Sequence, residues 1–193
     1  QDVARALGWI RDHGSQYPCD MRNIMLTGDS AGGQLAAYSA VLMQSAQLRK
    51  TFDTVDPQME LTALLLTSPV AFMRDGGLFS LYTKPMWGTD YKDKATYPYM
   101  DFDQIIDYAQ ALPPTYLITS SGDTLANKQT HRLYEVLQAH GVQAEIKDYA
   151  KAEYNQSLPH VFSVLQPFEP AGTAAIDKAL AFYQQAMTAK AAQ

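Results

Sequence analysis

With 193 residues, 47% of them hydrophobic and 18% charged, the chain has the composition of one folded globular domain rather than of a disordered or fibrous protein. A formal net charge of −5 at pH 7, with no run of Lys or Arg, argues against a nucleic-acid-binding or anionic-membrane-binding surface and favours small organic partners. No apolar run reaches the roughly 18 residues of a membrane span, and the single cysteine, Cys19, cannot form an internal disulfide, so we expect a reducing, cytoplasmic location.

The first third of the chain predicts a helix, a strand and a second helix. Apolar residues recur at helical spacing within residues 2–13, which are followed by Gly14. Residues 23–27 form a short apolar run that predicts a strand. Residues 31–48 are rich in Ala, Leu, Gln and Met and contain no proline, so they predict one continuous helix.

The remaining elements continue this alternation. The continuous apolar runs at 61–69 and 114–123 are typical of strands buried on both faces of a sheet. Residues 124–140 predict a helix ended by a glycine, residues 144–149 a strand nearer an edge, and residues 173–189 a final helix. This order indicates an α/β fold with a mostly parallel central sheet and helices on both faces.

Residues 70–113 interrupt the pattern with an aromatic and proline-rich stretch. Two interpretations remain open. The stretch is either a surface excursion whose aromatic side chains pack it down, or a cap that faces the substrate. The aromatic residues concerned are Trp87, Tyr91, Tyr97, Tyr99 and Phe102.

The sequence NIMLTGDSAGGQLAAYSAVL places Ser30 between an apolar strand and an alanine-rich helix. A serine hydroxyl is a poor nucleophile unless a base takes its proton and N–H donors meet the developing oxyanion. A sharp strand-to-helix turn would expose the Ser30 hydroxyl, aim the helix N-terminus at the site and present the N–H of Ala31. We expect such a turn to need tiny residues at Gly28 and Gly32, with Gly33 allowing close packing.

A structural alternative is a glycine-rich turn whose serine only caps the helix. The position of the motif between a strand and a helix favours the nucleophile.

His160 is the candidate base among four histidines. It follows the last predicted strand in a loop and precedes an apolar, helix-like run. His13 and His140 lie at helix ends, where they can interact with the last carbonyls, and His131 lies within a helix.

Asp123 is the candidate orienting acid. It ends a predicted parallel strand, and open α/β sheets gather their sites at the carboxyl ends of strands. It could also act as a helix N-cap. Asp148 and Glu153 are weaker candidates for the acid.

Three blocks of the sequence resemble the catalytic blocks of the hormone-sensitive-lipase-like branch of the α/β-hydrolases. They are GDSAGGQLA around Ser30, SSGDTL around Asp123 and LPHVF around His160, in the chain order Ser, Asp, His of that fold. The resemblance implies that Ser30 is the nucleophile, His160 the general base and then acid, and Asp123 the carboxylate that orients His160. It implies hydrolysis of short acyl or acetyl esters through an acyl-serine, with no metal and no cofactor.

One feature of the family is absent from the sequence. These hydrolases carry a His-Gly-Gly-Gly loop upstream of the nucleophile, which supplies further oxyanion donors, and no such stretch occurs here. We therefore expect residues 1–193 to be a single α/β-hydrolase domain corresponding to the C-terminal two-thirds of an esterase. The first residue is not methionine, which suggests a start inside a longer protein. An uncovered sheet edge would favour association with a second copy or with an N-terminal segment.

Two other functions fit the same residues. In a non-catalytic relative, the pocket would hold a small molecule and the triad would be idle. A peptidase of the same fold is less favoured, because the sequence supplies neither a propeller nor a charged pocket for a peptide terminus.

Overall fold

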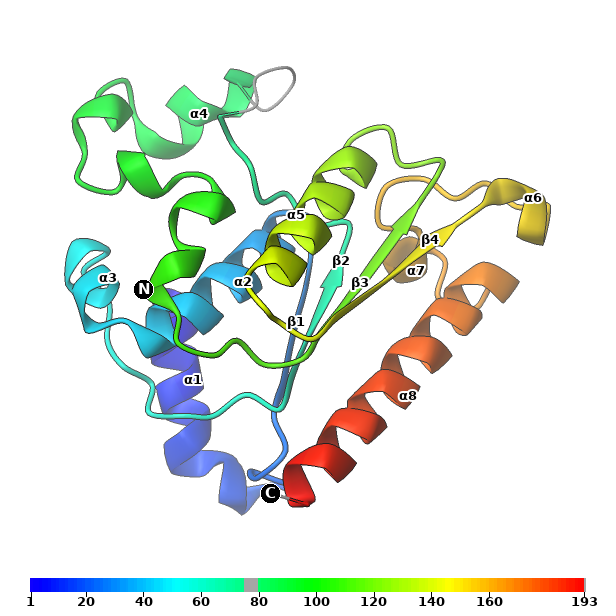
Figure 1. Cartoon of the computed structure of the whole chain (residues 1–193), viewed down its shortest axis with the longest axis horizontal. Helices are drawn as coiled ribbons and strands as arrows, with labels where there is room; N and C mark the ends of the chain where they lie inside the picture. The colour runs from blue at the N-terminus through cyan, green and yellow to red at the C-terminus, as the bar shows by residue number, and fades with distance from the viewer. Residues whose placement is uncertain (75–79, 193) are drawn as a thin grey trace.

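A computed structural model describes residues 1–74 and 80–192, in which strands and helices alternate as predicted (Figure 1). The strands are β1 (Met25–Asp29), β2 (Ala63–Thr67), β3 (Thr115–Ser120) and β4 (Ala144–Tyr149). The α-helices are α1 (Asp2–His13), α2 (Ala31–Gln44), α3 (Ala46–Thr51), α4 (Ser80–Trp87), α5 (Asn127–Ala139), α6 (Lys151–Tyr154), α7 (Phe162–Leu165) and α8 (Pro170–Ala191).

The four strands form one sheet in the order β1-β2-β3-β4, and each neighbouring pair is parallel. The carboxyl ends of all four strands therefore lie along the same edge of the sheet. This confirms the prediction of a parallel sheet and brings the segments that follow β1, β2 and β3 together.

The two faces of the sheet are covered by different helices. Leu64 and Leu66 of β2 pack into a core with α2 and α5, whereas Ala63 points to the other face and packs with α8. Tyr116 and Ile118 of β3 join the same core as Ala63. Figure 1 shows α8 on the opposite side of the sheet from α2 and α5. Because side chains alternate along a strand, both sets must be apolar, which explains the continuous apolar runs.

The prediction of one helix over residues 31–48 is wrong, because the helix breaks at Ser45. The backbone of Ser45 is extended, and its Oγ accepts a hydrogen bond from the N–H of Leu48 at 3.2 Å. The Arg49 guanidinium donates to the carbonyls of Leu42 and Met43 at the end of α2. These polar side chains form hydrogen bonds with backbone groups at the end of α2 and the start of α3. Neither proline nor glycine is present at the break, so the sequence lacks the usual sign of a helix end.

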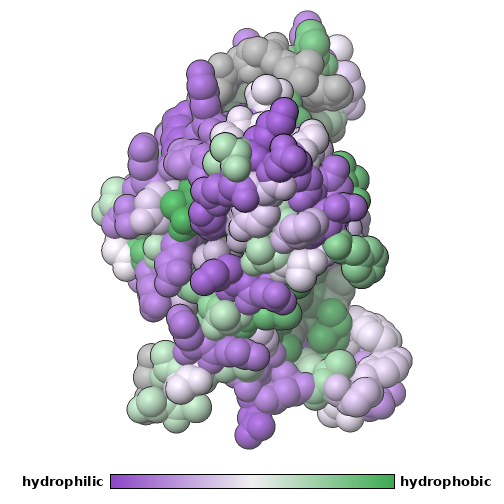
Figure 2. Space-filling view, turned by 90° about the vertical axis from the view of Figure 1, so that its right-hand side faces the viewer, coloured by the Kyte–Doolittle hydropathy of each residue, from purple (hydrophilic) through white to green (hydrophobic). Residues whose placement is uncertain are grey.

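Strand β4 is an edge of the described sheet, as predicted, and pairs with β3 alone among the described strands. Glu145 is exposed, and Lys147 forms an ion pair with Glu153 at 3.3 Å. The side of the molecule that carries α6 and β4 is mostly hydrophilic, with smaller hydrophobic areas between (Figure 2). Charged side chains at an edge strand discourage pairing with other chains. Strand β1 forms the other edge of the described sheet and carries fewer charges.

The segment from 70 to 113 contains α4 and four short 3₁₀ turns, although residues 75–79 lie outside the described residues. The turns are η3 (Tyr91–Asp93), η4 (Tyr97–Tyr99), η5 (Phe102–Gln104) and η6 (Ile106–Tyr108). Phe102 is fully buried, and its ring lies 6.0 Å from that of Tyr38 on α2. The later part of the segment, from Tyr99 to Tyr108, is therefore packed onto the main core. Trp87, Tyr91 and Tyr97 pack instead against a separate small cluster, and most residues between 81 and 96 are exposed or half-buried.

Candidate active site

Ser30 occupies the turn between β1 and α2, with a φ of 52°, in a region that residues other than glycine rarely adopt. Two hydrogen bonds hold its backbone against the end of β2 and the residues that follow it. The N–H of Ser30 donates to the carbonyl of Thr67 at 3.0 Å, and the N–H of Val70 donates to the carbonyl of Ser30 at 3.1 Å. A strained turn fixed from both sides gives Ser30 a defined orientation.

The glycines around Ser30 have different roles. A Cβ added at Gly28 would lie 2.2 Å from the carbonyl oxygen of Gly32, and one added at Gly33 would lie 2.8 Å from Cβ of Pro69. A Cβ at Gly32 would meet only a carboxylate oxygen of Asp29, at 4.0 Å. The prediction that the turn needs tiny residues is confirmed for Gly28 and Gly33, whereas the steric reason given for Gly32 is wrong. The backbone of Gly32, not its missing side chain, crowds Gly28.

This difference predicts that Gly28→Ala destabilises the protein by several kcal/mol, because a backbone atom must move to admit the new methyl group. Gly32→Ala is the matched control. We expect it to change the free energy of unfolding by no more than about 1 kcal/mol, since alanine suits a helix better than glycine. Urea unfolding of both variants measures the difference. Equal destabilisation by the two substitutions would contradict this account of the turn.

Asp123 follows β3 and uses its two carboxylate oxygens differently. Oδ1 accepts hydrogen bonds from the N–H groups of Leu125 at 3.0 Å and Ala126 at 2.9 Å, which caps the turn leading into α5. Oδ2 accepts a hydrogen bond from the Nδ1–H of His160 at 3.0 Å. Asp123 therefore caps this turn, not α5 itself, whose N-cap is Ala126, and the same side chain also contacts the candidate base.

The environment of Asp123 favours its ionised form. Burial raises the pKa of the carboxyl, but hydrogen bonds from His160, the Ala126 N–H and the Ser68 hydroxyl outweigh burial and lower the pKa overall. A buried carboxylate with several donors is fixed in position as well as in charge.

His160 lies in the loop between α6 and α7 and joins the other two candidates. Its Nε2 lies 2.9 Å from Ser30 Oγ, on the side of the ring opposite its contact with Asp123. If Nδ1 carries the proton donated to Asp123, Nε2 is free to accept from the hydroxyl. The three residues selected from the sequence thus form one hydrogen-bonded chain, Asp123 to His160 to Ser30.

The other histidines lie as predicted, His13 and His140 at helix ends and His131 within a helix. His13 and His140 each place Nδ1 within hydrogen-bond distance of a carbonyl in the preceding turn, at 2.9 Å from Trp9 and 2.7 Å from Val136. The weaker acid candidates also have other partners. Asp148 pairs with His131 at 2.9 Å, and Glu153 pairs with Lys147.

Sequence reasoning missed Ser68, which lies directly after β2 and is fully buried. Its Oγ accepts a hydrogen bond from the N–H of Val161, the residue after His160, at 3.4 Å, and its hydroxyl lowers the pKa of Asp123. A serine at the carboxyl end of a buried strand is the signal that could have identified it.

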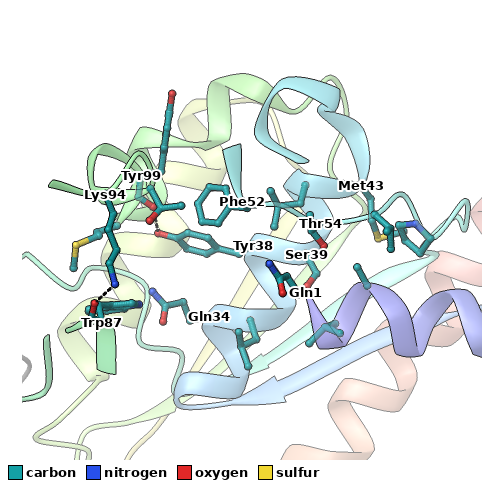
Figure 3. Close-up of a pocket in the computed structure, with 18 of the residues that line it drawn as sticks. Gln1, Gln34, Tyr38, Ser39, Met43, Phe52, Thr54, Trp87, Lys94 and Tyr99 are labelled. Atoms are coloured by element: carbon teal, nitrogen blue, oxygen red, sulfur yellow. Dashed lines mark hydrogen bonds between the residues drawn. The ribbon is translucent and has the colours of Figure 1, made fainter. Parts of the chain in front are cut away.

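A cavity of about 260 Å³ lies beside α2, with a mainly apolar lining (Figure 3). It extends past Gln34 and Tyr38 to Phe52, and Trp87 and Tyr99 of the 70–113 segment close its other side. Among the described residues, its lining does not include Ser30. Gln34 lies one helical turn after Ser30, so the cavity begins near the nucleophile turn and runs along α2.

Within residues 1–74 and 80–192, no group of three or more His, Cys, Asp or Glu side chains is placed to hold a metal ion. In the same residues, no helix has both the length and the apolar character needed to cross a membrane.

Comparisons with known proteins agree with the fold. Residues 1–158 match a family model described as the alpha/beta hydrolase fold. The probable carboxylic ester hydrolase LipM of Mycobacterium tuberculosis is 26% identical over 185 residues, which are 93% of this chain and 42% of that protein.

Two crystal structures of esterase B from Lactobacillus rhamnosis are also similar to this chain. One is 27% identical with a TM-score of 0.88, covering 98% of this chain and 61% of that one. The other, inhibited by a C4-C4 tributyrin phosphonate, is 28% identical with a TM-score of 0.86, covering 100% of this chain and 63% of that one. The chain therefore spans less than two-thirds of these relatives. Together with the parallel sheet and the strand-to-helix turn at Ser30, the family match shows that this chain belongs to the α/β-hydrolase fold family.

Proposed function

We propose that the protein is a serine carboxylesterase that hydrolyses short-chain acyl and acetyl esters through an acyl-serine intermediate. The hydrogen-bonded chain from Asp123 through His160 to Ser30 is the observation that carries this proposal. The similarity to a probable carboxylic ester hydrolase and to an esterase supports it. The C4-C4 tributyrin phosphonate on the related esterase B supports the preference for short acyl chains.

In the proposed reaction, Ser30 Oγ attacks the carbonyl carbon of the ester while His160 Nε2 accepts the hydroxyl proton. The negative charge that develops on the carbonyl oxygen is stabilised by the N–H of Ala31. Ala31 is the first residue of α2, where a backbone N–H has no partner within the helix. Gly28, Gly32 and Gly33 provide the turn that places this N–H beside the nucleophile.

Collapse of the tetrahedral intermediate breaks the bond to the alcohol oxygen, which takes the proton from His160 and leaves. The acyl group stays on Ser30. His160 next removes a proton from a water molecule, which attacks the acyl carbon, and the acid leaves as the proton returns to Ser30 Oγ. Asp123 holds His160 in the tautomer with the proton on Nδ1 and stabilises the charged ring.

We further propose that residues 1–193 act as one α/β-hydrolase domain in which the 70–113 segment is a substrate-facing cap. Trp87, Tyr91 and Tyr97 of this segment line the cavity beside α2. An apolar lining next to the nucleophile turn suits the hydrocarbon part of an ester.

The proposal is tested by hydrolysis of p-nitrophenyl esters of increasing acyl length. We expect kcat/KM to be highest for acetate and butyrate and to fall for long acyl chains. No turnover of any ester by the folded protein would contradict the proposed function.

Asp123→Asn should lower kcat by about 10⁴-fold. The amide oxygen can keep the hydrogen bonds from Leu125 and Ala126, which turns the NH₂ group toward His160. Because the NH₂ group is a donor, His160 Nδ1 must act as the acceptor. The ring proton then lies on Nε2, and Nε2 can no longer accept the proton of the Ser30 hydroxyl. Activity within tenfold of the wild type would contradict the role assigned to Asp123.

The same variant has a second readout, its stability as a function of pH. Because the folded pKa of Asp123 is lowered, its ionised form stabilises the fold above about pH 4, where an unfolded aspartate is ionised. That contribution disappears as the pH falls through the folded pKa. The stability difference between wild type and Asp123→Asn should therefore narrow as the solution is acidified, which urea unfolding at several pH values measures.

A further inference from the structure

Ser68 lies at the point where the three catalytic segments meet. It is the first residue after β2 and is fully buried, with a φ of 46°. Its N–H donates to the carbonyl of Ile118 in β3 at 2.7 Å. On either side of it, Thr67 and Val70 form the backbone hydrogen bonds that hold Ser30. The backbone of Ser68 is thus fixed between the nucleophile turn and the strand that leads to Asp123.

The Ser68 hydroxyl is close to both Asp123 and the loop that carries His160. It lowers the pKa of the Asp123 carboxyl, as a hydroxyl directed at the ionised form does. It also lies 3.4 Å from the N–H of Val161, the residue that follows His160. Because an N–H can only donate and an ionised carboxylate can only accept, the hydroxyl accepts from Val161 and keeps its own proton for the carboxylate. One buried side chain is therefore placed to link the acid to the loop that carries the base.

The loop around His160 needs such a support. Val161 has a φ of 52°, which a β-branched residue adopts only when its surroundings enforce it. The side chain of His160 is 23% exposed, whereas that of Asp123 is fully buried. The N–H of Val161 would lose an acceptor in a buried place without the Ser68 hydroxyl, and the histidine next to it would lose an anchor.

On the basis of the proposed function, we propose that Ser68 is a positioning residue of the triad, whose hydroxyl ties the Asp123 carboxylate to the His160 loop and so keeps His160 aligned with Ser30. Ser68 does not touch the ester. It acts by holding the two residues that move the proton. Its hydrogen bond also contributes to the lowered pKa of Asp123, as expected of a donor to the ionised form.

Two substitutions separate the hydroxyl from the backbone strain. Ser68→Ala removes the hydroxyl and keeps a Cβ, whereas Ser68→Gly removes the hydroxyl and also relieves the positive φ. Ser45→Ala is the control. It removes another buried serine hydroxyl, at the far end of α2, about 20 Å of helix from Ser30.

Both Ser68 variants should lower kcat for p-nitrophenyl acetate by about 10- to 100-fold, the loss expected when a hydrogen bond to a charged group is removed. KM should stay within about twofold, since substrate contacts are unchanged. Ser45→Ala should keep the wild-type kcat and KM, while its free energy of unfolding should fall by about as much as that of the Ser68 variants. Wild-type kcat in both Ser68 variants, or a change in KM alone, would overturn the proposal.

A second measurement separates this proposal from the proposed function. The proton NMR signal of His160 Nδ1–H reports its hydrogen bond with Asp123 whether or not the protein hydrolyses esters. We expect the signal to broaden or shift in Ser68→Ala and to stay unchanged in Ser45→Ala. An unchanged signal in Ser68→Ala would overturn the positioning role. Absence of turnover by the wild type would contradict only the esterase.

Discussion

Replacing Ser30 by alanine should reduce kcat for p-nitrophenyl acetate by about 10⁴- to 10⁶-fold, because the members of a triad act as one unit and the nucleophile has no substitute. Among the described residues, the hydroxyl has one side-chain partner, His160 at 2.9 Å. Its loss therefore removes the attacking atom without opening the core. Steady-state kinetics of the purified variant measure the effect.

The fold of Ser30→Ala is the control for that experiment. The backbone hydrogen bonds of Ser30 with Thr67 and Val70 do not involve the side chain, so thermal unfolding should be close to that of the wild type. Near-normal ester hydrolysis by a pure, folded Ser30→Ala protein would show that another group is the nucleophile.

His160→Gln should cause a loss of similar size, about 10⁴- to 10⁶-fold in kcat, since the serine is then left without a base. Glutamine fills much of the space of the imidazole but cannot accept and return a proton near neutral pH. The proton on Ser30 Oγ therefore has no acceptor. The measurement is again kcat for a short-chain ester.

His131 and His140 offer matched controls, because each also has an acidic partner. His131 Nε2 lies 2.9 Å from Asp148, and His140 Nε2 lies 3.0 Å from Asp107. In the described residues, neither is hydrogen-bonded to a serine. His131→Gln and His140→Gln should keep kcat within about threefold of the wild type, as surface substitutions usually have small effects. Loss of activity in either of them, with activity retained in His160→Gln, would show that the base is misassigned.

Much of the fold follows from local patterns in the sequence. The run from Ala63 to Thr67 is apolar at every position but the last, because its side chains enter cores on both faces of the sheet. The four strands and helices α1, α2, α5 and α8 follow from such runs and from helical periodicity. The break at Ser45 does not, since it depends on hydrogen bonds to single polar groups, which resemble ordinary helix residues in the sequence.

The candidate site was predictable where a motif fixes its local geometry. Ser30 is recognised by its turn, and Asp123 and His160 by the loops that follow strands. The difference between Gly28 and Gly32 was not predictable, because it depends on which backbone atom faces which residue in the folded turn. The role of Ser68 requires that β2, β3 and the His160 loop converge, and a contact between residues 93 positions apart has no local sequence pattern.

The central claim is that Ser30 is activated by His160. Labelling with a fluorophosphonate, followed by mass spectrometry of the peptides, tests it most directly, because such probes react with activated serines and require no knowledge of the natural ester. We expect a single adduct on Ser30 in the wild type, strongly reduced labelling in His160→Gln, and wild-type labelling in His131→Gln. A folded wild-type protein that leaves Ser30 unlabelled would contradict the account and favour a ligand-binding protein with an idle triad.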